Sequence, residues 1–253
     1  MFVYNGGFLT QSRVRRILDL AGYDLRLGLP KETDLVGIWG NSPTAHRGRS
    51  IAERYGTALL NVEDAFLRSI HPGRAGEPPL GLLLDRRGAH FDPAQVSDLE
   101  QILAGHPLDD SHMMRRARAA IGRLQDAHLS KYNAFSPEAP LPEPGYVLVV
   151  DQLRGDASVT ASKANRDRFR EMLYYAQEEN PGARVLIKTH PETTKGHRAG
   201  YFDARDTNDR VELFDAPASP HLLLEGAVGV YTVSSQLGFE AILAGHKPRI
   251  FGQ

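Results

Sequence analysis

Short apolar runs that end in polar residues constrain the fold of this chain more than any other feature. Residues 146–150 (YVLVV) lead directly into Asp151, and residues 185–188 (VLIK) lead into a polar segment. Between them, residues 166–179 are predicted to form a helix, because Asn180-Pro181-Gly182 is a strong stop signal. Strands that alternate with helices in this way are typical of parallel α/β units. We therefore predict an α/β fold.

The same alternation extends over the rest of the chain. Further strands are predicted at residues 2–4, 35–40, 57–62, 211–213, 227–233 and 249–251. Further helices are predicted around residues 14–18, from residue 50, and over residues 110–129 and 238–244. Residues 80–84 are expected to pair with the stretch around His90 and Phe91, across a turn at residues 86–88.

A proline-rich stretch divides the chain into two halves. Four prolines lie between residues 135 and 145: Pro137, Pro140, Pro142 and Pro144. Proline neither continues a helix nor fits a central strand, so this stretch is the best linker candidate. We predict an N-terminal Rossmann-like domain over residues 1–135, a linker over 136–145 and a C-terminal Rossmann-like domain over 146–253. The C-terminal domain is expected to be truncated, because no helix follows the strand at residues 249–251.

The composition excludes several classes of protein. With 41% hydrophobic and 24% charged residues, the chain has the composition of a folded globular protein. Thirty basic and 31 acidic residues leave a formal charge of −1, which provides no long-range attraction for nucleic acid. The absence of cysteine excludes disulfides and thiolate chemistry. Neither a signal peptide nor an apolar run of about 20 residues is found, so a cytoplasmic protein is predicted.

Polar residues at strand ends are the candidates for ligand binding, because open α/β sheets bind ligands there. Ser234 and Ser235 precede a predicted helix, where unpaired N–H groups and the helix dipole favour a phosphate. A serine that only caps the helix is the commoner arrangement. His190, with Lys188 two residues before it, can hydrogen-bond a ribose or phosphate oxygen.

Three carboxylates are candidates for chemistry. Asp156 lies between a strand and a helix, where it is suited equally to act as a nucleophile or base and to cap the helix. Glu63 and Asp64 are adjacent, so on an extended segment only one of them readily faces a cleft. The acid-rich stretches at residues 109–110 and 203–209 lack the spacing of a cation site, and we predict no metal cofactor.

Seven blocks of sequence occur in the order found in one known family. They are residues 34–43 (DLVGIWGNSP), 63–69 (EDAFLRS), 76–80 (GEPPL), 129–133 (LSKYN), 149–160 (VVDQLRGDASVT), 187–192 (IKTHPE) and 232–245 (TVSSQLGFEAILAG). Together these blocks resemble the KpsC-type capsular polysaccharide β-Kdo transferases, and the resemblance extends over residues 1–253.

The resemblance implies a GT-B-like fold with the active site in a cleft between two Rossmann-like domains. It implies a retaining, metal-independent glycosyltransferase that uses CMP-β-Kdo as donor. The acceptor would be a lysophosphatidylglycerol-linked oligo-Kdo glycolipid. Such an acceptor implies association with the inner face of the membrane or with a capsule-export complex.

The resemblance also assigns roles to individual residues. It assigns the CMP-sugar site to His190, Pro191, Ser234, Ser235 and Gln152. It implies that Asp156 is the nucleophile of a double displacement, and that Glu63 or Asp64 performs acid–base work on the acceptor hydroxyl. Because Kdo carries a carboxylate, a cation should meet it; Arg68 and Lys188 are the candidates, and a solvated surface role is equally open.

Two departures from the family leave alternatives open. The paired acids are usually followed by glycine, and here Ala65 follows them; a methyl group would interfere if that glycine required a positive φ. The family also continues beyond the position of Gln253. These departures favour one alternative, a non-catalytic scaffold for capsule assembly. A transferase for another CMP-sugar, similar to a sialyltransferase, is the second alternative, because the pocket contacts that distinguish the sugars are not visible in sequence. The presence of Asp156 and His190 argues against a scaffold.

Overall fold

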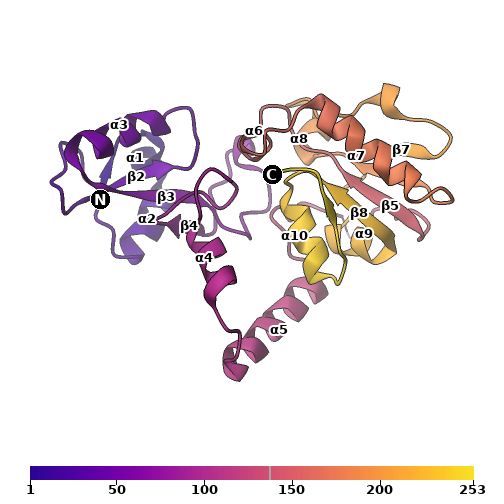
Figure 1. Cartoon of the computed structure of the whole chain (residues 1–253), viewed down its shortest axis with the longest axis horizontal. Helices are drawn as coiled ribbons and strands as arrows, with labels where there is room; N and C mark the ends of the chain where they lie inside the picture. The colour runs from indigo at the N-terminus through magenta and orange to yellow at the C-terminus, as the bar shows by residue number, and fades with distance from the viewer. Residues whose placement is uncertain (137) are drawn as a thin grey trace. The chain divides into compact units, whose positions relative to one another are not determined.

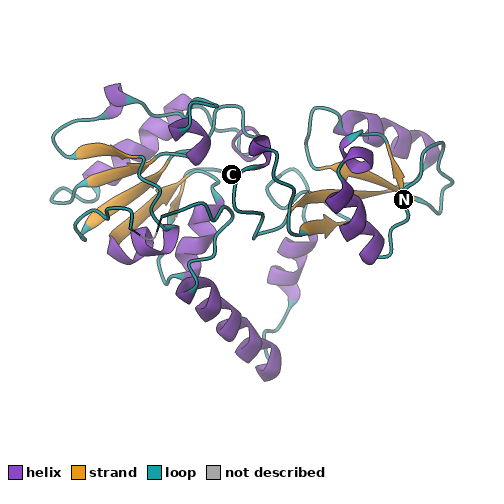
Figure 2. Cartoon of the chain, turned by 180° about the vertical axis from the view of Figure 1, so that it is seen from behind, coloured by secondary structure: helices purple, strands orange, loops and turns teal. Residues whose placement is uncertain are grey.

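The computed structural model describes residues 1–136 and 138–253 and divides into two compact units, Met1–Leu108 and Asp109–Gln253. In each unit, helices cover a β-sheet, as Figures 1 and 2 show. The predicted α/β class is confirmed. Pro137, one of the prolines of the predicted linker, lies outside the described residues.

The described part of the first unit contains a four-stranded sheet in the order β1-β2-β3-β4. Its elements are β1 (Phe2–Val3), α1 (Gly7–Thr10), α2 (Ser12–Leu20), β2 (Leu35–Trp39), α3 (Ala45–Tyr55), β3 (Ala58–Asp64), a 3₁₀ turn (Gly73–Ala75), β4 (Leu82–Asp85) and α4 (Asp98–Gly105). β1, β2 and β3 are parallel, and β4 is antiparallel to β3.

Two apolar clusters hold the first sheet between its helices. On one face, Val3, Leu60 and Val62 pack with Phe8, Val14 and Leu18 of the first two helices. On the other face, Val36 and Ile38 pack with Ala45 and Ala52 of α3. The alternation of Val36-Gly37-Ile38 along β2 explains this arrangement, because successive strand residues point to opposite faces.

The second unit contains a parallel sheet in the order β7-β6-β5-β8-β9. Its elements are α5 (Ser111–Asp126), β5 (Tyr146–Val150), α6 (Ala157–Ala161), α7 (Arg166–Glu178), β6 (Val185–Lys188), α8 (Pro191–Thr194), a 3₁₀ turn (Ala204–Asp206), β7 (Val211–Phe214), α9 (Pro220–Gly226), β8 (Ala227–Thr232), α10 (Gln236–Leu243) and β9 (Arg249–Ile250). Numbered within the unit, this order is 3-2-1-4-5, which follows the strand order of a doubly wound Rossmann sheet.

β5 is the central strand of this sheet, and all five of its residues are buried. Val147 and Val149 face a cluster that includes Phe169 and Met172 of α7. Tyr146, Leu148 and Val150 face the opposite cluster, which includes Leu223 and Leu224 of α9 and Ala241 of α10. A continuous apolar run is therefore required here, because both faces of the strand are covered.

The boundary between the two units differs from the predicted linker. It lies between Leu108 and Asp109, and α5 belongs to the second unit. Gln125 at the end of α5 donates to the carbonyl of Leu243 (2.9 Å), and the backbone N–H of Ser136 donates to the carbonyl of Pro217 (2.8 Å). Pro140, Pro142 and Pro144 therefore lie in a segment that runs along the second unit, because proline signals irregular backbone and not only a linker.

Three other predictions are corrected in the first unit. β4 pairs with β3, with Asp64 opposite Leu82, and not with the stretch at residues 90–91. The helix expected from Ser50 begins five residues earlier, at Ala45. The paired acids are the last two residues of β3 and do not follow it.

None of the described helices combines the length and the hydrophobicity that crossing a bilayer requires.

Candidate active site

The carboxyl ends of β5 and β8 meet where the strand order of the second sheet reverses. Open α/β sheets bind ligands outside such switch points. Gln152 follows β5 and Ser234 follows β8. The side-chain amide of Gln152 donates to Ser234 Oγ (3.1 Å), and the backbone N–H of Ser234 donates to Gln152 Oε1 (2.9 Å). Two of the predicted donor-site residues therefore lie in contact.

Ser235 is the N-cap of α10, and its Oγ accepts the backbone N–H of Leu237 (3.3 Å). The backbone N–H of Ser235 donates to Thr232 Oγ1 (3.3 Å), just as that of Ser234 donates to Gln152. The expectation of unpaired N–H groups at Ser234 and Ser235 is therefore wrong. The hydroxyl groups of Ser234 and Ser235 are therefore the candidates for binding an anion. The Ser235 hydroxyl hydrogen has no acceptor among the described residues.

Asp156 caps the helix α6 through only one of its oxygens. Asp156 Oδ1 accepts the backbone N–H of Ser158 (2.9 Å) and the Ser158 hydroxyl (2.7 Å). Within the part of the chain that the structure describes, Asp156 Oδ2 accepts no hydrogen bond. Capping and chemistry are thus compatible roles for this carboxylate, because they use different oxygens.

Ser158 connects Asp156 to Ser234. The Ser234 hydroxyl donates to Ser158 Oγ (3.2 Å), and Ser158 in turn donates to Asp156. A continuous hydrogen-bond chain, the Gln152–Asp156 chain, therefore runs from Gln152 through Ser234 and Ser158 to Asp156. Sequence reasoning placed Ser158 in the block at residues 149–160 without assigning it a role, and only the fold shows which residues it contacts.

His190 caps α8, with Pro191 at the first helical position. Its Nδ1 accepts the backbone N–H of Glu192 (3.1 Å), so the neutral ring carries its proton on Nε2. Burial, with added repulsion from Lys131, lowers the pKa of His190 to about 4. A neutral ring that can donate from Nε2 is therefore the form present near pH 7, and it suits an oxygen of a ribose or phosphate.

Three cations influence His190 from within the second unit: Lys131, Lys188 and Arg198. Burial lowers the pKa of Lys188 to about 8, and its ammonium lies 5.7 Å from the centre of the Phe214 ring. Arg198 donates to the carbonyl of Arg154 (2.7 Å). Sequence reasoning selected Lys188 but missed Lys131 and Arg198, which reach this region only through the folding of loops.

A buried glutamate lies behind the same region. Glu240 of α10 is 2% exposed and accepts the Ser130 hydroxyl at both oxygens (2.9 and 3.0 Å). Burial raises the pKa of Glu240. The contact fixes residues 129–133 against α10, which explains how Lys131 is held in the second unit.

Asp151 fixes the loop that carries Arg198, as Glu240 fixes residues 129–133. Asp151 is 3% exposed, and its Oδ1 accepts the backbone N–H groups of Gln152 and Tyr201 (both 2.9 Å). Burial raises the pKa of Asp151 to about 6. Gly200 is required beside it, because a Cβ there would overlap the carboxylate.

The paired acids of the first unit have different surroundings. Glu63 packs beside Gly40, which has a φ of +33° and where a Cβ would overlap the Glu63 carboxylate. Asp64 Oδ2 accepts Nε of Arg68 (2.8 Å), while Asp64 Oδ1 is buried and has no hydrogen-bond partner among the described residues. An orphaned buried oxygen of this kind costs stability unless a ligand or water satisfies it.

Arg68 is not a surface cation. It is 7% exposed, and besides Asp64 it donates to Ser69 Oγ (2.8 Å) and to the carbonyl of Glu77 (3.0 Å). The Glu77 carboxylate accepts the backbone N–H of His71 (2.5 Å). Arg68 thus joins the blocks at residues 63–69 and 76–80. Its burial excludes the surface role, while the contact with a sugar carboxylate stays a prediction.

Ala65 does not adopt the conformation that would demand glycine. The described non-glycine residues with positive φ are Leu108, His128 and Lys163, so Ala65 has an ordinary backbone. A Cβ on Gly81 would lie 3.3 Å from the Ala65 methyl group, which shows what this methyl group faces. The departure from the family's paired-acid motif therefore produces no backbone strain.

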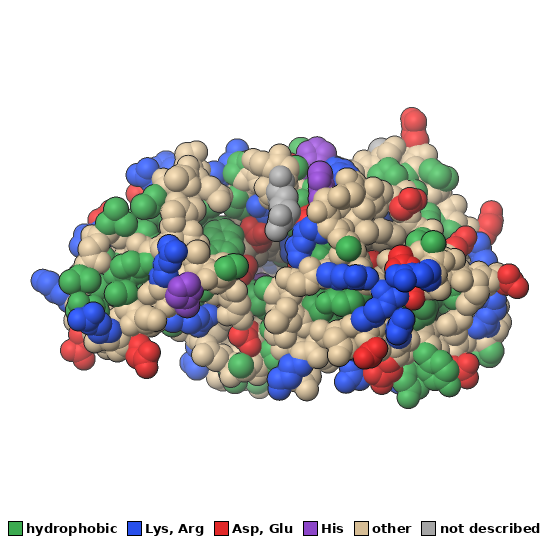
Figure 3. Space-filling model, turned by 90° about the horizontal axis from the view of Figure 1, so that it is seen from above, with side chains coloured by type: hydrophobic (Ala, Val, Ile, Leu, Met, Phe, Trp, Pro, Cys, Tyr) green, Lys and Arg blue, Asp and Glu red, His purple; other side chains and the backbone are tan. Residues whose placement is uncertain are grey.

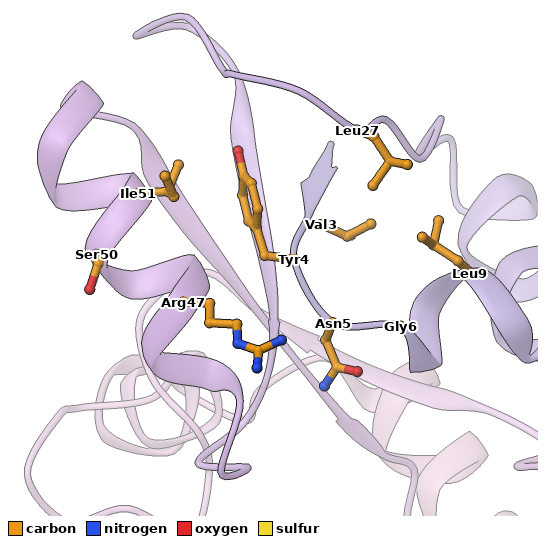
Figure 4. Close-up of a pocket in the computed structure, with 9 residues that line it drawn as sticks. All are labelled: Val3, Tyr4, Asn5, Gly6, Leu9, Leu27, Arg47, Ser50 and Ile51. Atoms are coloured by element: carbon orange, nitrogen blue, oxygen red, sulfur yellow. The ribbon is translucent and has the colours of Figure 1, made fainter.

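A separate cavity of about 510 Å³ lies along the edge strand β1 of the first unit, as Figure 4 shows. Val3, Leu9, Leu27 and Ile51 form apolar walls, and Arg47 lies at its side. None of the predicted site residues lines this cavity.

The charged residues of the described ranges form no metal site. Basic and acidic side chains share the face shown in Figure 3, in line with the formal charge of −1. Across the described ranges, no three His, Asp or Glu residues are grouped closely enough to hold a metal ion.

Comparison with known proteins places this chain in a family. The model of the family described as "Capsule polysaccharide biosynthesis protein" matches residues 34–143 and 112–253. The chain belongs to this family.

Curated relatives extend well beyond the region of similarity. The chain is 36% identical over 228 residues to the capsule polysaccharide modification protein LipA of Neisseria meningitidis serogroup B, covering 88% of this chain and 32% of LipA. It is 32% identical over 220 residues to the lipopolysaccharide-processing protein LpsZ of Rhizobium meliloti, covering 85% of this chain and 50% of LpsZ. The chain therefore spans a third to a half of the length of these relatives.

Two solved structures share the fold. The β-Kdo 2,4 transferase of Thermosulfurimonas dismutans KpsC matches with a TM-score of 0.89 and 32% identity, covering 99% of this chain and 79% of that chain. The β-Kdo 2,7 transferase of the same KpsC matches with a TM-score of 0.70 and 20% identity, covering 100% and 78%. The second match shows the fold alone.

Proposed function

We propose that this chain is a glycosyltransferase module that moves Kdo from CMP-β-Kdo to a lipid-linked oligo-Kdo acceptor during capsule linker synthesis. One observation carries the proposal: the Asp156 carboxylate and the Ser234 hydroxyl belong to one hydrogen-bond chain at the switch point of the second sheet. A CMP-sugar transferase that works through a covalent intermediate needs a nucleophile next to the groups that hold the phosphate. The 32% identity to the β-Kdo 2,4 transferase supports Kdo as the sugar.

The proposed reaction has two displacements. An oxygen of Asp156 bonds to the anomeric carbon of Kdo while the bond from that carbon to the phosphate oxygen breaks, and CMP leaves with the electron pair. The acceptor oxygen then bonds to the same carbon, and Asp156 leaves as a carboxylate. Glu63 or Asp64 of the first unit takes the acceptor proton. Two inversions at one carbon give net retention.

The leaving group is stabilised by neutral donors in this proposal. His190 Nε2–H and the hydroxyls of Ser234 and Ser235 donate to the oxygens of CMP, with Pro191 fixing the start of α8. Donors held in place by the fold stabilise developing charge without reorganisation, so the reaction needs no metal ion. Lys131, Lys188 and Arg198 supply the positive charge that the Kdo carboxylate requires.

The resemblance and the comparisons also support a finer proposal. We propose a GT-B-like arrangement in which the first unit supplies the acceptor side, with a glycolipid as acceptor. The linkage is proposed to be 2→4, because identity is 32% to the 2,4 transferase and 20% to the 2,7 transferase.

The test is an assay of transfer with defined acceptors. The protein is incubated with CMP-β-Kdo, generated in place because this donor is labile, and with a synthetic Kdo-terminated acceptor. Mass spectrometry should show the gain of one Kdo residue. An acceptor whose terminal Kdo lacks the 4-hydroxyl should not react, whereas one that lacks the 7-hydroxyl should react normally.

The controls separate the alternatives. Transfer from CMP-sialic acid but not from CMP-β-Kdo would indicate a different sugar on the same scaffold. CMP binding without any transfer would show that this chain does not catalyse the reaction by itself. If calorimetry shows that CMP does not bind, the donor site described here is wrong.

A further inference from the structure

We propose that Ser158 is a positioning residue for transfer: its hydroxyl orients Asp156 so that Oδ2 is the attacking oxygen, and it couples this carboxylate to the phosphate-holding Ser234. This inference rests on the proposed function. The inference adds a role for a side chain outside the predicted site and identifies which oxygen of Asp156 attacks.

The direction of every bond in the Gln152–Asp156 chain is fixed. Gln152 Oε1 accepts the Ser234 backbone N–H, so the other end of the amide is the nitrogen and must donate to Ser234 Oγ. At the opposite end, an ionised Asp156 can only accept, so Ser158 must donate to it (2.7 Å). The remaining bond therefore runs from the Ser234 hydroxyl to Ser158 Oγ (3.2 Å).

The two oxygens of Asp156 are consequently unequal. Oδ1 holds two hydrogen bonds, both from Ser158, and Oδ2 holds none among the described residues. Hydrogen bonds to an ionised oxygen stabilise its lone pairs and reduce their tendency to attack. The geometry thus reserves Oδ2 for the anomeric carbon, and the pair of bonds from Ser158 stops the carboxylate from rotating.

The chain also connects donor binding to the Asp156 carboxylate. A hydroxyl has one hydrogen, so when a phosphate oxygen accepts the Ser234 hydrogen, Ser158 no longer receives it. Hydrogen bonds in a chain strengthen one another, and the loss of one weakens the next. The bond from Ser158 to Asp156 is then weaker but remains, so Ser158 still holds Oδ1 and leaves Oδ2 free to attack when the phosphate is in place.

Two substitutions separate positioning from folding. Ser158→Ala removes the hydroxyl but keeps the backbone N–H that Asp156 Oδ1 caps, so α6 retains its start. Ser158→Thr keeps the hydroxyl and should restore the rate. Thr160→Ala is the matched control, because it removes a hydroxyl from the same helix that bonds to the backbone carbonyl of Asp156 (2.9 Å) and not to its carboxylate.

The experiment measures steady-state transfer from CMP-β-Kdo with the wild type and these three variants. Ser158→Ala should lower kcat about 10- to 100-fold, the effect of losing a hydrogen bond to a charged group, and change KM for the donor less than about threefold. Ser158→Thr and Thr160→Ala should remain close to wild type.

Each opposite result has a distinct meaning. If Ser158→Ala keeps kcat within about twofold of wild type, or if Ser158→Thr is as impaired as Ser158→Ala, the positioning role is refuted while the transferase proposal stands. If Ser158→Ala raises KM and leaves kcat unchanged, Ser158 binds the donor and does not position Asp156. If the wild type transfers no sugar while still binding CMP, the proposed function fails and this inference fails with it.

Discussion

Replacing Asp156 in two ways separates its two roles. Asp156→Asn keeps an Oδ1 that accepts the backbone N–H of Ser158 (2.9 Å in the wild type), whereas Asp156→Ala removes this cap. Asparagine and aspartate are equally good N-caps, so the Asn variant should keep the free energy of unfolding within about 0.5 kcal/mol of wild type. The Ala variant should lose about 1 kcal/mol.

Both Asp156 variants should lose the same catalytic function. Neither can form the glycosyl ester, so transfer should fall at least about 1000-fold, which corresponds to about 4 kcal/mol of the activation barrier. CMP affinity should remain equal or rise slightly, because a negative charge near the phosphate is removed. Thermal unfolding, calorimetry with CMP and mass spectrometry of the acceptor measure the three effects. If Asp156→Asn retains a tenth or more of wild-type turnover, Asp156 is not the nucleophile.

Three further predictions concern the residues that support the site. Because burial raises the pKa of Asp151 from 3.8 to about 6, its contribution to stability is present at low pH and is lost as the pH rises. The stability of wild type relative to Asp151→Asn should fall by about 2 kcal/mol between about pH 4 and pH 7, measured by urea unfolding. A pH-independent difference would contradict the shift. Gly40→Ala should lower the free energy of unfolding by about 1–3 kcal/mol, because the φ of Gly40 is +33° and the new Cβ would overlap Glu63. CMP affinity should not change. An unchanged free energy of unfolding in urea would contradict the geometry. Arg68→Ala should lower the free energy of unfolding by about 3 kcal/mol, because it leaves the Asp64 carboxylate unpaired. Arg68→Lys should recover only part of this loss in the same assay, because lysine lacks the forked guanidinium that also reaches the carbonyl of Glu77. Full recovery would show that the guanidinium is not needed.

The second unit was largely predictable from sequence because its strands are continuous apolar runs. β5 was predicted with its observed bounds, since a strand covered on both faces needs five apolar residues in a row. The start of α3 was missed because Gly48 weakens the helical pattern. A Cβ at Gly48 would lie 2.5 Å from Ile38, so this glycine is there to let the helix pack closely on β2. Such a packing requirement cannot be seen in local sequence.

The candidate site was predictable as a set of residue types and not as a set of contacts. The position of Gln152 and Ser234 after parallel strands placed them at one edge of the sheet. Sequence could not show that Arg68 is already committed to Asp64 and Glu77, because that pairing depends on a loop closing on itself. The role of Ser158 depends on distances of 2.7 and 3.2 Å, which no motif encodes.

The most direct test of the account is to search for a Kdo residue bound to the protein. Wild type and Asp156→Asn are mixed with CMP-β-Kdo without acceptor, quenched in acid and analysed by intact-protein mass spectrometry, with peptide fragmentation to locate the adduct. The account predicts one Kdo residue, linked as an ester to Asp156 in the wild type and absent from the variant, which disappears when the acceptor is added. Transfer to the acceptor without any adduct on Asp156, or an adduct on another residue, would contradict it.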